Sequence, residues 1–395
     1  MRRLRYNIMY ITIFWGQSMK KELRIGLLGF GAMGKTHAWC VHNLPYYYRD
    51  LPFSAKVAGV CTTTQAKSEA VAKEYGFELA VTDEMALIED PSIDIIDICT
   101  PNIYHYETAK RALAAGKHIY CEKPLCVTSD EARELAALAK ESGKICTVVF
   151  NNRYMPPILR AAELIREGRL GRILSFSVEY LHDSCLDAER PAGWKQNADV
   201  CGGGVLFDLG SHAIDLIYLL CGEFESVMGA SQIAFPTRRG MDGSRWETNA
   251  DEAFYMIAKL RSGAVGTITA SKLARGSNDD LNLSITGELG AIKFSLMNPN
   301  YLYFYDTARP AGGLGGERGF TAIECVGRYP SPAGGFPAPK APVGWLRGHL
   351  GSMYSFLNSV NTGIQAAPSF SDGAHVQFVM NAAYRSSKEH CEIKI

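Results

Sequence analysis

The sequence has no excess of charge of either sign, because its 41 Lys and Arg residues are balanced by 41 Asp and Glu residues. Without a net positive charge or a run of basic residues, we expect no nucleic-acid partner and no attraction to an anionic membrane. The 11 cysteines are scattered singly and form no C-x-x-C pair, so the sequence predicts no metal site. Several, such as Cys99, lie in apolar runs. Buried free thiols are typical of a reducing compartment, and we expect a cytoplasmic protein.

The first 19 residues have the charge pattern, but not the other features, of a targeting segment. Arg2, Arg3 and Arg5 precede an apolar stretch from Tyr6 to Trp15. This stretch is too short to span a bilayer, and no cleavage site of the small-x-small type follows it. We therefore interpret residues 1–19 as a dispensable extension, with a signal peptide and a structured arm as the alternatives.

The chain has 395 residues, which predicts two domains. Between residues 20 and 150 strands and helices alternate, and Gly76, Gly116 and Gly143 each follow a predicted helix. The predicted strands are 23–29, 56–61, 93–99, 118–122 and 145–150, and the predicted helices are 32–43, 68–75, 106–115 and 130–141. Repeated strand–helix units predict an α/β domain built on a doubly wound parallel sheet.

Residues 151–395 have a different pattern and form the predicted second domain. The runs 173–180, 254–260, 264–270 and 281–286 alternate in polarity, which predicts a mainly antiparallel sheet. Residues 311–344 are rich in Gly and Pro and are expected to form a long surface loop. Residues 346–360 and 374–388 are the predicted closing helices.

A glycine-rich turn between the first strand and the first helix predicts a dinucleotide site. It reads Gly29-Phe30-Gly31-Ala32-Met33-Gly34. In such a turn the first glycine permits the tight bend, the second lets the backbone approach a pyrophosphate, and the third lets the helix pack on the sheet. The helix N-terminus then offers amide donors and the positive end of its dipole.

The residues after the second strand leave the choice between NAD and NADP open. An acidic residue that binds the ribose is expected there, but the sequence has Thr62 and Thr63 instead. Their hydroxyls can hydrogen-bond to a ribose or to a phosphate. Lys67 on the next helix can pair with a 2′-phosphate, or it is an exposed lysine with no role in binding.

Two further motifs carry groups for proton and hydride chemistry. Glu122-Lys123-Pro124 follows a strand, and carboxyl ends of parallel strands face the ligand crevice. A lysine there can stabilise a developing alkoxide. If residues from about 207 onward are helical, Asp208 and His212 lie four apart on one face, and a neutral histidine can take a proton from an alcohol. Taken alone, Lys123, Asp208 or His212 would more often have a structural role. Asp215, which follows His212, is expected to have a structural role.

Together these motifs resemble the glucose–fructose oxidoreductase/inositol dehydrogenase family, called Gfo/Idh/MocA, from about residue 22 to the C-terminus. The resemblance rests on the 29–34 turn, Thr100-Pro101-Asn102 with His105, Glu122-Lys123-Pro124, residues 204–215 and residues 368–373. The E-K-P tripeptide combined with D-x-G-x-H at this separation is its most specific part.

The resemblance implies a Rossmann domain followed by an α/β domain with a large open sheet, through which members form dimers or tetramers. It also implies Lys123, Asp208 and His212 as the catalytic group, with His212 as base and Lys123 polarising the substrate oxygen. It places Asn102, His105 and Glu122 near the nicotinamide and Arg153, Trp194 and Lys195 on the substrate side. The chain departs from the family at Thr62, where many members carry an acid.

These observations lead to one expected function and two alternatives. We expect an NAD(P)-dependent oxidoreductase that moves a hydride between the nicotinamide and a secondary alcohol or ketone of a sugar, glycoside or cyclic polyol. One alternative is a hydrolase or lyase that uses tightly bound NAD only transiently to cleave a glycoside. The other is a noncatalytic nucleotide sensor, which would not need Lys123, Asp208 and His212 together.

Overall fold

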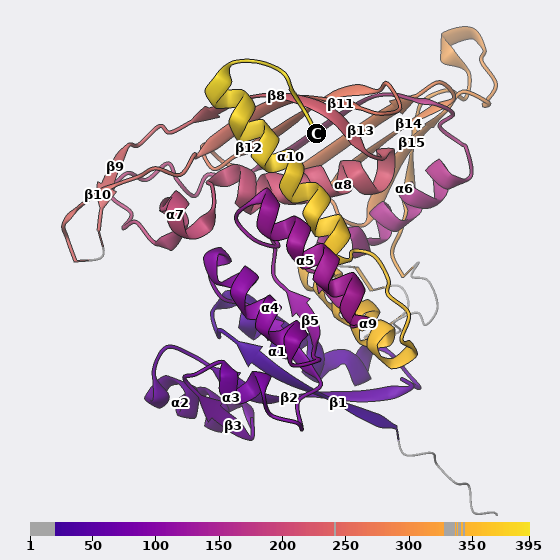
Figure 1. Cartoon of the computed structure of the whole chain (residues 1–395). Helices are drawn as coiled ribbons and strands as arrows, with labels where there is room; N and C mark the ends of the chain where they lie inside the picture. Colours follow the sequence, from indigo (N-terminus) through magenta and orange to yellow (C-terminus); the bar gives the residue numbers. More distant parts are fainter. Residues whose placement is uncertain (1–19, 241, 328–335, 337, 339–340, 343) are drawn as a thin grey trace, which may run out of the picture.

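The computed structural model describes residues 20–240, 242–327, 336, 338, 341, 342 and 344–395. The extension expected at residues 1–19 lies outside the described residues. The chain forms two layered domains, with the N-terminal residues below and a large sheet above in the view of Figure 1.

The N-terminal domain is a six-stranded parallel sheet in the order β3-β2-β1-β4-β5-β6, the strand order of a doubly wound dinucleotide fold. Its strands are β1 (Lys21–Leu28), β2 (Phe53–Cys61), β3 (Leu79–Val81), β4 (Ile95–Ile98), β5 (His118–Cys121) and β6 (Cys146–Val148). All four residues of β4 are buried, as expected for a strand that helices cover on both faces.

Helices cover both faces of this sheet. They are α1 (Ala32–Tyr47), α2 (Gln65–Tyr75), α3 (Met85–Ile88), α4 (His105–Ala114) and α5 (Ser129–Ser142). The alternation predicted from the sequence is confirmed, but β3 and α3 were missed. Both are too short to show a periodic pattern, and no residue of β3 is fully buried because it forms the edge of the sheet.

The C-terminal domain is a nine-stranded sheet in the order β16-β15-β14-β13-β7-β12-β11-β8-β17, in which only β7 and β12 pair in parallel among the described residues. Its strands are β7 (Ile173–Leu181), β8 (Phe224–Gln232), β11 (Ala253–Leu260), β12 (Val265–Ser271), β13 (Asp280–Gly287), β14 (Gly290–Ser295), β15 (Tyr301–Asp306), β16 (Phe320–Glu324) and β17 (Ile393–Lys394). A separate hairpin joins β9 (Thr237–Arg239) to β10 (Arg245–Glu247).

The expected loop at 311–344 is partly wrong, because β16 lies within it and pairs with β15. Alternating polarity over only five residues, of which none is fully buried, gave too weak a signal. Several other residues of this stretch lie outside the described part of the chain.

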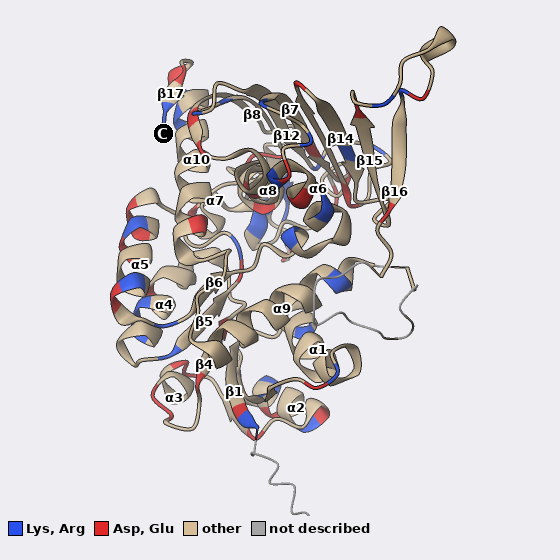
Figure 2. Cartoon of the chain, turned by 90° about the vertical axis from the view of Figure 1, so that its right-hand side faces the viewer, with Lys and Arg blue, Asp and Glu red and all other residues tan. Residues whose placement is uncertain are grey.

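One face of the large sheet carries helices and the other is open. Helices α6 (Pro156–Arg166), α8 (Ser211–Cys221) and α10 (Phe370–Glu389) lie between the sheet and the N-terminal domain (Figures 1 and 2). The stretch Ala198–Cys221 is apolar and long enough to cross a membrane by composition, but 78% of its most apolar window is buried inside the fold. That burial is typical of the core helix of a soluble protein.

Helix α9 (Trp345–Thr362) crosses back to the N-terminal domain and lies beside α1 (Figure 2). Its apolar side joins the core of the parallel sheet through Leu350, Met353, Phe356, Leu357 and Val360. Within the second domain, the buried guanidinium of Arg153 donates to Asp215 on α8 and to Asp372 on α10.

Candidate active site

A cavity of about 680 Å³ runs along the carboxyl edge of the parallel sheet and continues under the C-terminal domain. At one end are the glycine turn and Thr62, Thr63 and Lys67, and at the other are Lys123 and Asp208. Most of the residues predicted for the cofactor line it: Gly29, Phe30, Gly31, Ala32, Met33, Thr62, Thr63, Lys67, Thr100, Pro101, Asn102 and Glu122.

The backbone at the three glycines of the turn is compatible with the roles predicted for them. Gly29 has φ of +89°, and a Cβ there would lie 2.6 Å from the carbonyl oxygen of Cys99. At Gly34 a Cβ would overlap the carbonyl oxygen of Gly29, so the helix can approach the strand only without a side chain. A Cβ at Gly31, in contrast, would meet nothing within 4 Å, which leaves the backbone open to the cavity. This arrangement fits a dinucleotide whose pyrophosphate lies at the N-terminus of α1.

The end of the cavity near β2 is lined by hydroxyls and one lysine. Thr62 is buried, and its Oγ1 lies 2.8 Å from the Oγ of Ser68, so its hydroxyl is already bound within the protein. Thr63 and Lys67 are exposed and line the cavity, together with Thr82, which the sequence analysis missed. Thr63 and Lys67 are therefore better placed than Thr62 to meet a ribose or its phosphate.

At the other end three lysines converge on the carboxylate of Asp208. The Nζ atom of Lys123 lies 3.1 Å from its Oδ1, that of Lys195 lies 2.9 Å from Oδ1, and that of Lys272 lies 2.8 Å from Oδ2. Burial alone would raise the pKa of Asp208, but the three positive charges outweigh it and hold this pKa well below its usual value. Asp208 is therefore an ionised anchor that fixes the ammonium group of Lys123.

Lys272 was missed by the sequence analysis, although the sequence contains a signal for it. Alternate residues of β12, Gly266, Ile268 and Ala270, are buried on the helix-covered face, and Lys272 continues this alternation just beyond the strand. A charged side chain in an inward-facing position requires a partner. That partner is Asp208, which is remote in sequence.

His212 stands at the start of α8 and is buried with its ring edge-on to Phe150 and Tyr180, at centroid distances of 6.0 Å each. The chain is helical from about residue 207, as predicted, but Leu206–Gly210 form a π-helical turn before α8 begins. The lysines bind Asp208, and among the described residues the Nδ1 atom of His212 has no hydrogen-bond partner, the Asp208 carboxylate included. Burial, followed by the charge of Lys123, lowers the pKa of His212 to about 3, so the imidazole is neutral.

Four predicted residues, Gly34, His105, Arg153 and His212, do not line the cavity. His105 is fully buried, with Nδ1 2.9 Å from the carbonyl oxygen of Pro124 and Nε2 2.9 Å from that of Thr100, so it lies between the two loops that carry lining residues. Arg153 is held by Asp215 on α8 and Asp372 on α10, within the second domain. The interpretation of Arg153 as a substrate contact is therefore corrected: its charge is fully used in a buried structural network. Trp194 and Lys195 do line the cavity.

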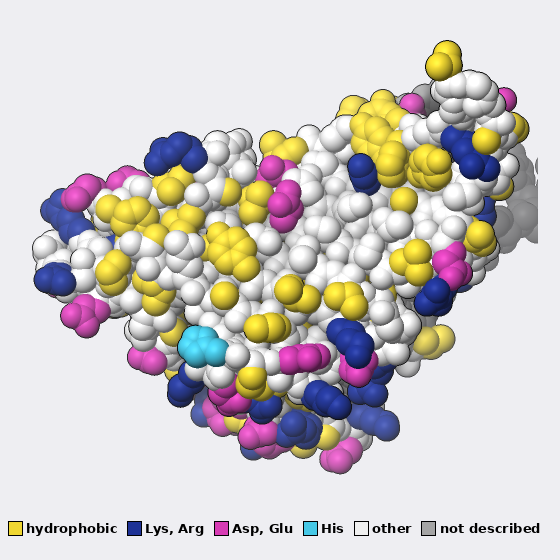
Figure 3. Space-filling view, turned by 90° about the horizontal axis from the view of Figure 1, so that it is seen from above, with side chains coloured by type: hydrophobic (Ala, Val, Ile, Leu, Met, Phe, Trp, Pro, Cys, Tyr) yellow, Lys and Arg dark blue, Asp and Glu magenta, His cyan; other side chains and the backbone are white. Residues whose placement is uncertain are grey.

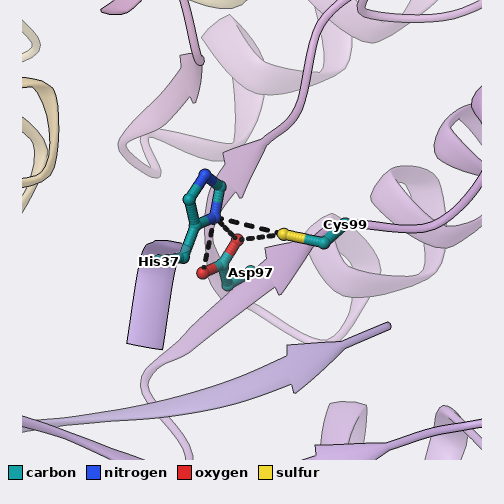
Figure 4. Close-up of side chains that lie close together, drawn as sticks. All are labelled: His37, Asp97 and Cys99. Carbon is teal, nitrogen blue, oxygen red and sulfur yellow. Dashed lines mark hydrogen bonds and ion pairs between the residues drawn. The ribbon is translucent and has the colours of Figure 1, made fainter. Parts of the chain in front are cut away.

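A buried hydrogen-bonded cluster beneath Glu122 was also missed. His37 on α1 places Nδ1 2.9 Å from Asp97 and 3.1 Å from the thiol of Cys99 (Figure 4). Its Nε2 lies 3.1 Å from Glu122. Burial would raise the pKa of Glu122, but His37 outweighs it and lowers this pKa to about 2. Both nitrogens of His37 are thus engaged with carboxylates, and the cluster holds an ionised Glu122 at the edge of the cavity.

Comparisons with known proteins agree with this arrangement. Residues 23–150 match the family described as oxidoreductases with an NAD-binding Rossmann fold, and residues 158–293 match the GFO/IDH/MocA C-terminal domain. A levoglucosan dehydrogenase from Pseudarthrobacter phenanthrenivorans is 29% identical over 388 residues, which are 95% of this chain and 98% of that protein. The scyllo-inositol 2-dehydrogenase (NAD+) of Bacillus subtilis is 29% identical over 69% of this chain and 74% of its own length.

A solved structure of levoglucosan dehydrogenase in complex with NADH and levoglucosan superposes with a TM-score of 0.90 at 30% identity. It covers 95% of this chain, and this chain covers all of that one. The likeness thus includes both domains. The chain belongs to the Gfo/Idh/MocA family of oxidoreductases.

Proposed function

We propose that this protein is an NAD(P)-dependent oxidoreductase that interconverts a secondary alcohol and a ketone on a sugar, glycoside or cyclic polyol. The observation that supports it most strongly is a single cavity with a dinucleotide turn at one end and, at the other, Lys123 with the neutral His212 nearby. The names of the relatives, which are dehydrogenases of levoglucosan and inositols, support the same class of substrate.

The chain's own residues account for the proton transfer. A bound nicotinamide would supply the hydride acceptor or donor. His212 takes the hydroxyl proton at a ring nitrogen, and its low pKa leaves it unprotonated beforehand. The ammonium group of Lys123, fixed by Asp208, donates to the substrate oxygen as negative charge develops. Trp194 and Lys195 close the substrate side of the cavity.

The test is a screen of sugars, anhydrosugars and inositols, including levoglucosan and scyllo-inositol, with NAD+ and NADP+ at the nicotinamide absorbance. We expect net accumulation of reduced cofactor with at least one compound. Glycoside cleavage without accumulation would instead support the enzyme that uses NAD transiently. Binding of cofactor without turnover of any compound would support a nucleotide sensor.

The open face of the large sheet supports the proposal of a homo-oligomer, either a dimer or a tetramer. Met228 on β8 lies opposite Ile257 on β11, and Tyr255 and Val265 extend the exposed apolar surface. Figure 3 looks onto this face, where apolar and uncharged side chains occupy most of the centre. Light scattering should give at least a dimer mass for the protein, and Ile257→Lys should reduce it.

We also propose a cytoplasmic location, which the free cysteines of the described chain support.

A further inference from the structure

A second cavity, of about 430 Å³, adjoins the first at Asp208, and the mechanism above does not use it. Asp208, Trp194 and Lys195 line both cavities, so the two are contiguous there. Lys123 lines only the first and Lys272 only the second. The glycine turn is at the opposite end of the first cavity. A group that occupies the second cavity during the reaction is therefore part of the substrate and not of the cofactor.

The second cavity is lined mainly by the loop that follows β7, and its charges are unequal. Arg238 on β9 is balanced, because its guanidinium is paired with Glu252 and both side chains are 3% exposed. Among the described residues that line the cavity, four carry a basic group and one carries an acidic group; the basic ones are Arg190, Lys195, Arg238 and Lys272, and the acidic one is Asp208.

The two lysines of the second cavity are only partly balanced. Lys195 and Lys272 share the carboxylate of Asp208, at 2.9 and 2.8 Å, and the catalytic lysine binds the same carboxylate. Three ammonium groups around one carboxylate leave an excess of positive charge, and Lys272 is only 7% exposed. Burying an unbalanced charge is costly, so this arrangement fits a negative charge that comes from outside the chain.

Arg190 adds a further positive charge where the second cavity meets a hollow on the surface. Its Nη1 donates to the carbonyl oxygen of Ser184 at 3.1 Å, and among the described residues no carboxylate lies within 4.0 Å of its guanidinium. The nearby carboxylate of Asp279 is already bonded by Tyr180 and His182. A guanidinium is a planar fork of donors that matches a phosphate or a carboxylate.

We propose that the substrate carries an anionic group, a phosphate or a carboxylate, which binds in the second cavity to Arg190, Lys195 and Lys272. This inference rests on the proposed function and narrows its substrates to sugar or polyol phosphates and sugar acids. The reacting hydroxyl lies beside Lys123, in the first cavity. The charge that develops on the reacting oxygen is met there, so it does not account for the basic groups that line only the second cavity.

The experiment compares ligands that differ only in an anionic group. The pairs are glucose with glucose 6-phosphate, glucose with glucuronate, and myo-inositol with its 1-phosphate. Titration calorimetry measures the binding of each ligand to the NADH complex. We expect the anionic member of at least one pair to bind at least about tenfold more tightly, because a hydrogen bond to a charged group is stronger than a neutral one. This preference should decrease as salt is added. The phosphate and glucuronate pairs distinguish the two anions.

Arg190→Gln tests the proposed contact, and Arg275→Gln is the matched control. Arg275 is also an exposed arginine and lines the surface hollow beside Arg190, but it does not line the second cavity. We expect Arg190→Gln to lower the preference for the anionic ligand by about twofold to fivefold, since Arg190 is exposed. Arg190→Lys keeps the charge and should recover part of the loss. Arg275→Gln should leave the preference unchanged.

A second pair of variants tests whether the cavity itself is occupied. Gly193 lines it with φ of −119°, and a Cβ there would meet only Gln196 Oε1, at 3.7 Å, so Gly193→Phe can fill the cavity without backbone strain. Gly344 has φ of −124° and open space around it, and it lines neither cavity, so Gly344→Phe is the control. We expect only Gly193→Phe to abolish the preference for the anionic ligand.

The results that would overturn the inference are distinguishable from failure of the proposed function. Equal affinity for both members of every pair, with oxidation of a neutral sugar or polyol, overturns the inference and leaves the proposed function standing. Tighter binding of a neutral disaccharide than of any anionic ligand would assign the second cavity to a second sugar ring. Equal loss of both members in Arg190→Gln would make Arg190 a structural residue. If the wild type binds and oxidises no sugar or polyol, charged or neutral, the proposed function itself fails.

Discussion

The two ends of the cavity are built in different ways. The end that we propose receives the pyrophosphate consists of backbone from one continuous stretch, residues 29–34, and its shape depends on missing side chains. The catalytic end consists of charged side chains from four separate places, which are Lys123, Lys195, Asp208 and Lys272. The first end is specified locally, by steric constraints. The second exists only once the two domains have met, and it depends on electrostatic balance.

The largest effect is expected at the catalytic end. His212→Ala and Lys123→Ala should each lower kcat by roughly 10²–10⁴-fold, the usual contribution of a positioned acid or base. NADH affinity, measured by fluorescence, should stay nearly unchanged because the pyrophosphate end is intact. The two losses should be less than additive, since both groups act on one oxygen. Near-normal turnover in both variants would show that the site is misplaced.

The next largest effect is expected at the glycine turn, where a substitution should weaken cofactor binding. Gly31→Val should weaken NADH binding by at least about tenfold, the equivalent of 1.4 kcal/mol, because its side chain projects into the cavity. Its melting temperature should be unchanged, since a Cβ at Gly31 meets nothing within 4 Å. Gly34→Val is the matched contrast: it overlaps the carbonyl of Gly29 and should lower the melting temperature. Equal behaviour of the two variants would contradict the roles assigned here.

A smaller effect tests the electrostatic balance around Asp208. Lys272→Met should lower stability by about 1–3 kcal/mol, because it removes a buried hydrogen bond to a charged group while two lysines remain. Lys195→Met should cost less than about 1 kcal/mol, because 46% of the Lys195 side chain is exposed and its ion pair is screened by solvent. Urea unfolding of both variants measures this difference. The comparison that matters is which variant loses more stability. A larger loss in Lys195→Met than in Lys272→Met would show that Lys272 is not the main partner that stabilises Asp208.

The smallest effect concerns cofactor choice. Thr63→Asp should favour NAD over NADP by up to about fivefold, because exposed charges interact weakly. Thr62→Asp should instead destabilise the protein, since Thr62 is buried against Ser68. The ratio of kcat/KM for the two cofactors measures the first effect, and thermal melting measures the second. An unchanged ratio in Thr63→Asp would mean that other residues meet the ribose.

The sequence predicted what is local and missed what depends on tertiary contacts. The glycine turn, the alternation of strands and helices, and the Glu122-Lys123 motif can be predicted because a short pattern determines each of them. Lys272 could not be assigned, because its role depends on Asp208, which is more than 60 residues away in the sequence. Arg153 was wrongly assigned to the substrate because its partner is also remote in the sequence. Asp215 meets Arg153 only when α8 packs against the turn that carries Arg153.

The return of α9 to the first domain has a consequence for how the protein is made. The apolar side of α1 is covered by residues such as Leu350 and Phe356, which are synthesised about 200 residues after β6. At about 5–20 residues per second, translation of this interval takes roughly 10–40 s. During this time the N-terminal half remains attached to the ribosome with part of its core uncovered. Vectorial folding is therefore incomplete until nearly the whole chain has emerged, and a product released early would expose an apolar surface to chaperones and proteases.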